Sequence, residues 1–327
     1  MSGYFKITIV TPSYNQGAFI EETIDSILSQ SYPNLEYMII DGGSTDNTLE
    51  IIKKYEKHIN YWVSEKDDGQ SHAINKGLNK MTGELFNWIN SDDILLPNSL
   101  EKVNEVFQKN DVLCFKGRLK HIKENQLINF ELNHSKNEKL MCWLDPVVNQ
   151  QSTFYHKKAI SLMGPLSNDL HYSMDYEWWI KYLILFGIEK AEFDQNYLAG
   201  FRLHGDSKTM SDSYIFQRDI ANILHSLCLQ LKLEKYSDLL ATAYEIYPSY
   251  KLKVSKLSID KELAEKMVIY FIFKWNRWSV NSIQRKTIRK ILNLVDNREL
   301  GFLKSNWKNE AIENAKLLSY WKRKIGF

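Results

Sequence analysis

The sequence lacks the features that define several large classes of protein. Its three cysteines (Cys114, Cys142 and Cys228) lie far apart and form no spacing that suits a disulfide or a metal site. Free thiols favour a reducing compartment, so we expect a cytoplasmic protein. No uncharged apolar run approaches the roughly 20 residues of a membrane-spanning helix, and no signal peptide is recognisable. An integral membrane protein is therefore not expected.

Two common phosphate-binding motifs are also missing. The chain contains no GxxxxGK[ST] sequence, and no GxGxxG sequence follows the first predicted strand. These absences exclude a P-loop enzyme and a Rossmann dehydrogenase. A disordered polymer is excluded as well, because the 327 residues include only 6 prolines and 14 glycines and carry a net charge of +2.

The small net charge hides an asymmetry along the chain. Residues 251–327 contain 18 Lys and Arg against 7 Asp and Glu, whereas the first 250 residues contain 24 against 33. An acidic body followed by a basic tail indicates two modules with different partners.

The first 116 residues alternate between two hydrophobic patterns. Strands are predicted at 7–11, 35–40, 61–64, 85–89 and 112–116, and helices at 18–30, 46–55, 71–81 and 99–108. Short connections between alternating strands and helices imply right-handed crossovers. The pattern therefore predicts an α/β fold whose sheet is mainly parallel and sandwiched by helices.

The alternation ends after Gly117. The sequence then predicts a hairpin at 118–133, a strand at 152–156, a helix at 175–186 and a strand at 198–203. From about residue 213 the patterns are helical only, at 214–231, 261–274, 282–294 and 310–324. We therefore expect a first domain over residues 1–212 and an all-helical C-terminal region over 213–327.

Polar clusters follow four of the predicted strands. They are Thr11-Pro12-Ser13-Tyr14-Asn15, Asp41-Gly42-Gly43-Ser44, Asp67-Asp68-Gly69 and Asn90-Ser91-Asp92-Asp93. Each cluster alone is typical of a turn or a helix cap. Together they lie at the edge of the sheet where α/β proteins bind ligands, which predicts one composite site.

The carboxylates of these clusters have no matching set of cations nearby, which favours a bound divalent ion. Mg²⁺ and Mn²⁺ prefer one or two carboxylates together with phosphate oxygens. Asp92 and Asp93 stand at a predicted strand end and fit such a site, which a diphosphate would complete.

These motifs resemble those of the family 2 glycosyltransferases, which have the GT-A fold. The resemblance rests on the four clusters and on Asn75-Lys76-Gly77, and continues more weakly through Gln151-Ser152-Thr153-Phe154, Met174-Asp175-Tyr176-Glu177-Trp178 and Arg202-Leu203-His204. It covers about the first 210 residues. It implies a nucleotide-binding half over residues 1–116 and an acceptor half over 117–212.

The resemblance also implies roles for individual residues. Thr11, Pro12 and Tyr14 would line the base and ribose pocket, Asp41 would accept a hydrogen bond from the base, and Asp68 would close the pocket. Asp92 would bind Mn²⁺ or Mg²⁺, with Asp93 beside it and His204 near the metal and the diphosphate. Asp175 would be the general base of an inverting transfer from a nucleotide sugar to an acceptor hydroxyl. A UDP-sugar is the expected donor.

Two positions depart from the family pattern, and two keep alternative interpretations. Asn90 stands where an aspartate is commoner, which would weaken metal binding, and Gln150 stands where related sequences often have histidine. Asp175 alone would be interpreted as the N-cap of the following helix, with Glu177 as the next candidate base. His204 alone would be an ordinary loop histidine.

The basic tail allows two interpretations. Residues 251–327 include Trp275, Trp278, Trp307 and Trp321 among their basic residues. In the first, this region contacts anionic lipid at the inner face of the cell membrane, where a lipid-linked acceptor would be found. In the second, it packs as a helical subdomain. Nucleic-acid binding is not expected, because the body is acidic and no binding module is recognisable.

The sequence thus favours a glycosyltransferase of surface polysaccharide, lipopolysaccharide or glycoprotein synthesis. Two alternatives remain: a nucleotidyltransferase on a related fold, or a catalytically silent scaffold of a glycan assembly complex. The first usually needs a cation in the loop after the first strand, which residues 13–17 lack. A silent scaffold has no chemical need for Asp41, Asp92 and Asp175.

Overall fold

The computed structural model describes residues 3–109, 111–123, 126–129, 139–145, 147–205, 213–276, 282–294 and 300–303. The chain divides into two compact units. The first comprises Met1–Lys139, Val147–Ser213 and Val254–Leu257, and the second comprises Leu140–Pro146, Tyr214–Lys253 and Ser258–Phe327. The chain therefore passes between the units more than once.

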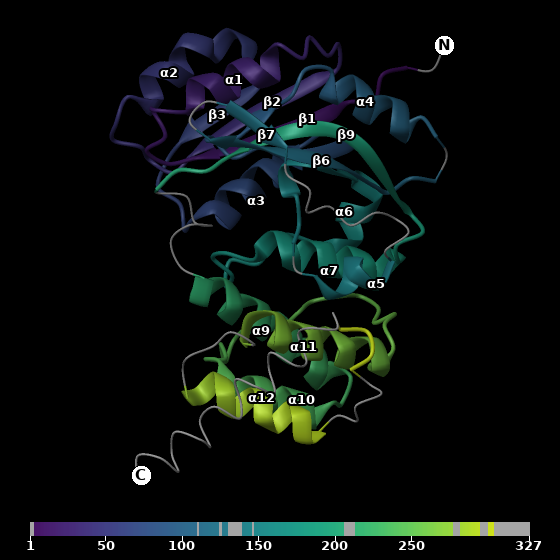
Figure 1. Cartoon of the computed structure of the whole chain (residues 1–327). Helices are drawn as coiled ribbons and strands as arrows, with labels where there is room; N and C mark the ends of the chain where they lie inside the picture. The colour runs from purple at the N-terminus through teal and green to yellow at the C-terminus, as the bar shows by residue number, and fades with distance from the viewer. Residues whose placement is uncertain are drawn as a thin grey trace. The chain divides into compact units, whose positions relative to one another are not determined.

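The first unit is built on a nine-stranded sheet (Figure 1). Its strands are β1 (Ile7–Ser13), β2 (Leu35–Asp41), β3 (Tyr61–Ser64), β4 (Leu85–Trp88), β5 (Ile94–Leu95), β6 (Cys114–Lys123), β7 (Gln126–Asn129), β8 (Thr153–His156) and β9 (Ala191–Arg202). They follow the order β3-β2-β1-β4-β8-β6-β9-β5, with β7 paired to β6.

The two halves of the sheet differ in strand direction. β1 runs parallel to β2 and β4, and β2 runs parallel to β3, so these four strands end at one edge. Beyond β4 the pairs β4–β8, β8–β6 and β9–β5 are antiparallel, while β6 and β9 are parallel. The carboxyl ends of the parallel strands are where the predicted site must form.

Helices cover both faces of this sheet (Figure 1). They are α1 (Ile20–Leu28), α2 (Thr48–Tyr55), α3 (Gln70–Lys80), α4 (Ser99–Phe107), α6 (Lys157–Met163) and α7 (Met174–Phe186), with 3₁₀ turns at Glu56–His58 and Gln150–Ser152. Helices α1, α2 and α4 share one core with β1 and β2, whereas α3 packs against the opposite face.

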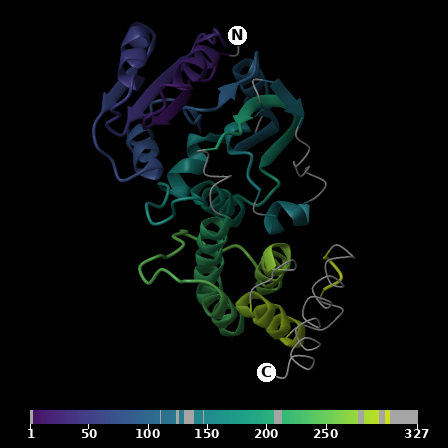
Figure 2. The same ribbon diagram turned by 60° about the vertical axis from the view of Figure 1, so that its left-hand side comes forward.

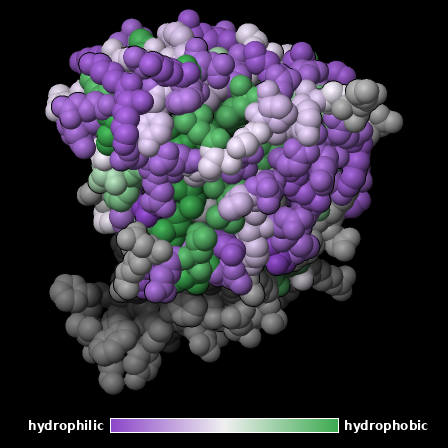
Figure 3. Space-filling model, turned by 90° about the horizontal axis from the view of Figure 1, so that it is seen from above, coloured by the Kyte–Doolittle hydropathy of each residue, from purple (hydrophilic) through white to green (hydrophobic). Residues whose placement is uncertain are grey.

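The spacing of apolar residues explains why these segments form amphipathic helices. In α1, Ile20, Ile24 and Ile27 are fully buried, while Glu22 and Asp25 face solvent. The face that carries α1, α2 and α4 is accordingly mostly hydrophilic, with hydrophobic side chains gathered in a band across its middle (Figure 3).

The second unit is helical. Its helices are α5 (Lys139–Leu144), α9 (Ser213–Gln230), α10 (Glu234–Ala243), α11 (Lys261–Asn276) and α12 (Ser282–Leu294). The first residues of α5 and α9, Lys139 and Ser213, are counted with the first unit. Figure 2 shows α9 as a long green rod. Across the described ranges, no helix combines the length and the apolar character that crossing a bilayer requires.

The predicted fold class is confirmed: the first unit is α/β with helices on both faces, and the C-terminal part is helical. Two of the predicted strands were too short. One strand, β6, covers the end of the strand predicted at 112–116 and the first arm of the hairpin, and β9 begins at Ala191 rather than at 198. The helix predicted at 310–324 lies outside the described residues.

Candidate active site

A cavity of about 740 Å³ lies at the carboxyl ends of the parallel strands. All four polar clusters that the sequence singled out contribute to its wall, together with two residues at and beyond the end of β9. The lining residues are Pro12, Ser13, Tyr14, Gln16, Gly42, Gly43, Lys66, Asp67, Gly69, Gln70, Ala73, Asn90, Ser91, Asp92, Phe201 and His204. The structure therefore brings the clusters together in one composite site.

The carboxylate of Asp92 faces this cavity beside His204. Asp92 Oδ2 lies 3.0 Å from His204 Nε2, and both side chains are mostly buried, with 20% and 16% of their surface exposed. The imidazole of His204 packs on the ring of Phe19, with 4.7 Å between ring centroids. A carboxylate oxygen and an imidazole nitrogen, both suited to binding a divalent ion, thus meet at the cavity wall.

Asp93 is placed differently from Asp92. Its side chain is fully buried and accepts hydrogen bonds from Gln151 Nε2 (2.9 Å), Asn90 Nδ2 (3.2 Å) and the backbone N–H of Arg202 (3.0 Å). Burial, together with the neighbouring charge of Asp92, raises the pKa of Asp93 well above its ordinary value. Asp93 does not line the cavity, so its expected contact with sugar or metal stays a prediction.

The contacts of Asn90 give a physical reason for an amide at this position. Its Nδ2 donates to Asp93 Oδ2, and its Oδ1 accepts a hydrogen bond of 2.7 Å from Gln70 Nε2. An aspartate at position 90 would instead place a second carboxylate against the buried Asp93, where like charges repel.

Arg202 ties the end of β9 to the Asp92–Asp93 turn. Its Nε donates to the carbonyl oxygen of Asp92 (3.1 Å), its guanidinium pairs with Glu22 of α1, and it lies over the ring of Phe19 at 5.4 Å. These contacts place His204, two residues later, beside Asp92.

The residues predicted to hold the base and ribose are only partly on the cavity wall. Pro12 and Tyr14 line the cavity, and 60% of the Tyr14 surface is exposed. Thr11 is fully buried, and its hydroxyl lies 3.1 Å from the Tyr37 hydroxyl.

Asp41 is also buried behind the wall. Its carboxylate accepts hydrogen bonds from the backbone N–H groups of Gly43 (3.0 Å) and Ser44 (2.9 Å) and from the hydroxyls of Ser44 (2.5 Å) and Ser64 (2.6 Å). Its predicted hydrogen bond with a base stays a prediction.

Asp67 lines the cavity, whereas Asp68 does not, and the role of Asp68 in closing the pocket stays a prediction. Asp68 is exposed and lies 3.4 Å from the imidazole of His72. Asp67 lines the wall, where its Oδ1 accepts a hydrogen bond from the N–H of Gly69 (2.9 Å). A Cβ atom at Gly42 would lie only 2.9 Å from Asp67 Oδ2, so glycine at 42 allows this carboxylate its place. Adjacent aspartates in one turn gave no signal for choosing between them.

Gln16 and Lys66 line the cavity although sequence reasoning assigned them no role in the site, and Ser13 of the first cluster lines it as well. Within the described part of the chain, the buried atoms Ser13 Oγ and Gln16 Oε1 have no hydrogen-bond partner, and both residues line the cavity. Buried polar atoms are rarely left unpaired, so a water or a polar ligand in the cavity would be the partner of these two. Lys66 supplies a cation at the wall that the sequence did not reveal as part of the site.

Asp175 lies in the first turn of α7, which begins at Met174, and its N-cap is Ser173. The alternative interpretation of Asp175 as the N-cap is therefore wrong by two residues. Its Oδ1 accepts a hydrogen bond of 2.7 Å from the N–H of Tyr176, and the side chain is half-buried and not part of the cavity wall. Its role as a base stays a prediction.

Glu177 is unsuited to the role of base. Only 1% of its side-chain surface is exposed, and it pairs with Lys181 at 3.2 Å. Gln150 is buried as well, and its Nε2 donates to Asn87 Oδ1 (2.8 Å) and to the carbonyl of Trp88 (2.6 Å).

Asp92 and His204 fit a divalent ion only as part of a larger ligand set. Among the residues that the structure describes, no three His, Cys, Asp or Glu side chains form a group that could hold a metal ion. Two side chains at a cavity wall suit an ion that takes its remaining ligands from a substrate diphosphate.

Comparison with known sequences agrees with the geometry. Residues 8–162 match the model of the family described as Glycosyl transferase family 2. An uncharacterized glycosyltransferase of Rickettsia typhi is 30% identical over 213 residues, which are 62% of this chain and 65% of that protein. The putative teichuronic acid biosynthesis glycosyltransferase TuaG of Bacillus subtilis is 36% identical over 115 residues, which are 34% of this chain and 46% of that protein. The chain thus spans less than two thirds of each of these relatives.

Solved structures share the fold. S. aureus TarS 1–349 in complex with UDP-GlcNAc superposes with a TM-score of 0.64 and 13% identity, over 98% of this chain and 92% of that one. A mannosyltransferase from Pyrobaculum calidifontis in complex with GDP-Man and Mn²⁺ gives a TM-score of 0.56 and 15% identity, over 97% and 86%. Residues 8–162 thus match a family 2 glycosyltransferase domain, and the fold around them is the GT-A fold of glycosyltransferases.

Proposed function

We propose that this chain is an inverting glycosyltransferase that moves a sugar from a UDP-sugar to an acceptor hydroxyl in the synthesis of a cell-surface glycan. The observation that carries the proposal is the cavity at the ends of β1, β2 and β4, with Asp92 and His204 3.0 Å apart in its wall. The family match over residues 8–162 supports the same reaction class.

The donor assignment rests on the relatives. The TarS structure contains UDP-GlcNAc, and the TuaG name refers to teichuronic acid biosynthesis. We take a UDP-sugar as the donor, with a hexose or N-acetylhexosamine as the sugar. The unpaired Ser13 Oγ and Gln16 Oε1 are available to hydrogen-bond its ribose or phosphates.

Mn²⁺ or Mg²⁺ is the cofactor in this proposal, and Asp92 and His204 are the residues that would hold it. When bound, such an ion offsets the negative charge that grows on a leaving diphosphate. Lys66 at the cavity wall adds a positive charge of the chain's own for the phosphates.

Asp175 is the general base of the proposed reaction. It takes the proton of the acceptor hydroxyl while the acceptor oxygen bonds to the anomeric carbon. The bond from that carbon to the diphosphate oxygen breaks, and its electron pair leaves with UDP. Attack from the side opposite the leaving group inverts the anomeric carbon. Asp175 remains half-buried beside Tyr176, where partial exclusion of water helps a carboxylate to act as a base.

The acceptor in this proposal is a glycan or a lipid-linked glycan at the inner face of the cell membrane, and the protein is cytoplasmic. The basic residues after 251 would provide contact with anionic lipid. In the described part of this region, α12 buries Ile288 and Ile291 and exposes Lys286, Arg289 and Lys290. Its apolar face is thus occupied, so we propose an electrostatic contact rather than insertion.

The experiment is a screen of sugar nucleotides. The purified chain is incubated with UDP-glucose, UDP-galactose, UDP-GlcNAc, UDP-GalNAc or GDP-mannose in Mn²⁺ or EDTA, and the nucleoside diphosphate released is measured by chromatography. We expect UDP release from one UDP-sugar in Mn²⁺, lost in EDTA and in Asp92→Ala. Release of pyrophosphate from a nucleoside triphosphate and a sugar phosphate would instead show a nucleotidyltransferase. No turnover of any donor would favour a silent scaffold.

A further inference from the structure

The Asn75-Lys76-Gly77 motif of α3 has no place in the cavity wall, although the family resemblance rests partly on it. Gly77 packs on β1, since a Cβ there would lie 2.5 Å from Val10 Cγ2. Lys76 pairs with Glu65 at 2.7 Å. Asn75 faces Leu166: its Oδ1 accepts from the N–H of Leu166 (3.0 Å), and its Nδ2 donates to the carbonyl of Leu166 (2.9 Å). The asparagine therefore holds a loop distant in sequence.

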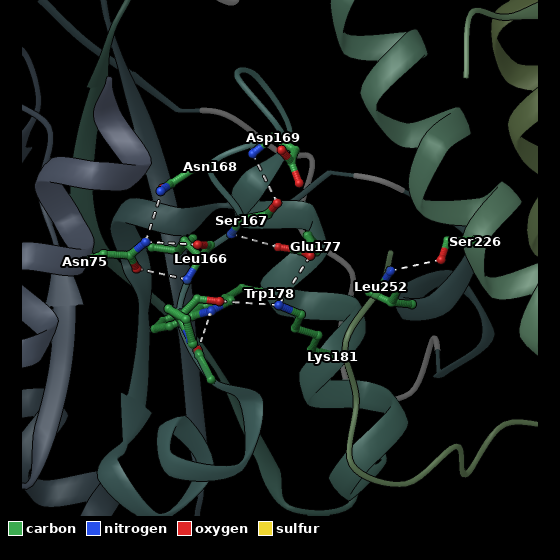
Figure 4. A network of polar contacts seen from close by, with 12 residues as sticks. Asn75, Leu166, Ser167, Asn168, Asp169, Glu177, Trp178, Lys181, Ser226 and Leu252 are labelled. Carbon is green, nitrogen blue, oxygen red and sulfur yellow. Dashed lines mark hydrogen bonds and ion pairs between the residues drawn. The ribbon is translucent and has the colours of Figure 1, made fainter. Parts of the chain in front are cut away.

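Helix α7 holds the same loop from its other side (Figure 4). Trp178 Nε1 donates to the carbonyl of residue 164 (3.2 Å), and Lys181 Nζ donates to that of residue 165 (3.3 Å). Glu177 Oε2 accepts from the N–H of residue 167 (3.2 Å). Residues 164–167 are thus bonded one after another to side chains of α3 or α7. We call this loop and its partners Asn75, Glu177, Trp178 and Lys181 the clamp.

The clamp connects the start of α3, which lines the cavity, with the first turn of α7, which carries Asp175 and lies outside the cavity wall. Gly69, Gln70 and Ala73, at the start of α3, line the cavity. Asp175 and Glu177 share the first turn of α7. A path of hydrogen bonds therefore runs from the helix beside the donor cavity, through Asn75 and the loop, to the turn that carries Asp175.

The burial of the ion pair in the clamp argues for a role in positioning. The side chains of Glu177 and Lys181 are 1% and 4% exposed. Buried ion pairs contribute little to stability relative to apolar residues of similar size, because both charges lose their hydration. What such a pair does supply is a fixed geometry, and here each partner also holds one backbone group of the loop.

We propose that Asn75, Glu177 and Lys181 are positioning residues that set the first turn of α7, and with it Asp175, against the donor cavity. The inference rests on the proposed function, in which Asp175 is the base. Displacing a reacting group by about 1 Å can cost about 10²-fold in rate, so a loosened clamp slows turnover without weakening the donor site. Glu177 acts through the loop and touches no substrate.

The test compares UDP binding with turnover in variants of the full chain. In Glu177→Ala we expect the Kd for UDP in Mn²⁺ to stay unchanged. The kcat for UDP release, measured with the UDP-sugar that the wild-type chain uses, should fall by about 10²-fold. Asn75→Ala, on the other side of the loop, carries the same expectation. The double variant Glu177→Gln with Lys181→Met keeps an acceptor for the N–H of Ser167 and leaves no unpaired charge, but it loses the donor to the carbonyl of residue 165. Its kcat should therefore lie between that of Glu177→Ala and that of the wild-type chain.

A matched control removes a surface ion pair of the same unit. Lys190→Met breaks the exposed pair with Asp111 and should change neither Kd nor kcat. The inference is overturned if Glu177→Ala and Asn75→Ala lower only the melting temperature, or if they weaken UDP binding and turnover equally. If the wild-type chain binds UDP but turns over no sugar nucleotide, the proposed function fails and this inference fails with it. If the wild-type chain is active and the variants bind UDP more weakly, only the positioning role of the clamp is contradicted.

Discussion

Three carboxylates at and just beyond the ends of β2 and β4, the strands on either side of β1, differ in what they are free to bind. Asp41 accepts four hydrogen bonds from its own chain, and Asp93 accepts three. Both are fully buried. Asp92 faces the cavity and lies within hydrogen-bond distance of His204. Asp92 is therefore the carboxylate of this group that is placed to meet a ligand.

The substitution Asp175→Asn tests the proposed base. The amide keeps the size and an acceptor oxygen for the N–H of Tyr176, so the helix and UDP binding should stay near wild type. Turnover should fall by about 10²–10⁴-fold, because proton removal alone is lost. Steady-state UDP release and calorimetric UDP titration measure the two effects separately. A variant that kept more than about a tenth of the wild-type rate would place the base elsewhere.

Among the secondary-structure elements, a buried glutamate ties β2 to β1 and to the segment that precedes β4. Glu36 of β2 accepts hydrogen bonds from Thr8 of β1 (2.6 Å) and from the hydroxyl (2.5 Å) and N–H (2.8 Å) of Thr82, and pairs with Lys6 at 2.9 Å. Burial by itself would raise its pKa, but these hydrogen bonds outweigh burial and lower the pKa from 4.5 to about 2.

This lowered pKa predicts a dependence of stability on pH. Glu36 stabilises the fold fully above its unfolded pKa of about 4.5, and the contribution is lost as the pH falls towards 2. Glu36→Gln should therefore lower the free energy of unfolding at pH 7 by about 3 kcal/mol, with a smaller difference below pH 4. Urea unfolding at several pH values measures this, with the exposed Glu50→Gln as control. An equal loss at pH 3 and pH 7 would assign the effect to packing.

Much of the first half of the fold could be predicted from sequence because its elements are local and strongly periodic. The predicted strands 35–40 and 61–64 differ from β2 and β3 by at most one residue, and the helix at 71–81 is shifted by one from α3. The clustering of the strand ends followed from parallel topology.

Long-range pairing explains what the sequence did not reveal. The two-residue strand β5 exists because Ile94 and Leu95 pair with Gly200 and Ala199 of β9, about a hundred residues away. The place of Asp67 in the cavity wall likewise depends on the space that Gly42 leaves, which the order of residues in one turn does not encode. The clamp on residues 164–167 joins helices α3 and α7 and has no local signal.

For the molecule as a whole, the charge asymmetry predicts binding to anionic surfaces. Each basic side chain near such a membrane contributes about 1 kcal/mol, and salt screens it. The full chain should sediment with phosphatidylserine vesicles at low salt and be released at high salt. Lys286→Glu with Lys290→Glu on the exposed face of α12 should weaken this binding, whereas Lys53→Glu with Lys57→Glu in the first unit should not.

Charge reversal leaves the packing of the second unit intact, whereas removal of the chain after Tyr250 would not. Truncation would remove α11, whose Val268, Ile269 and Phe271 are buried in the second unit. If the wild-type chain ignores anionic vesicles, or if both pairs of substitutions weaken binding equally, the basic region is a packed helical subdomain and the membrane contact is wrong.

The central claim is that Asp92 and the diphosphate of a nucleotide share one divalent ion at the end of the parallel strands. Calorimetric titration of UDP into the full chain, in Mn²⁺ and in EDTA, tests it most directly, with Asp92→Ala and the exposed Asp25→Ala as matched variants. We predict that Mn²⁺ strengthens UDP binding to the wild-type chain and to Asp25→Ala but not to Asp92→Ala. Equal affinity in EDTA, or the same Mn²⁺ dependence in Asp92→Ala, would contradict the account.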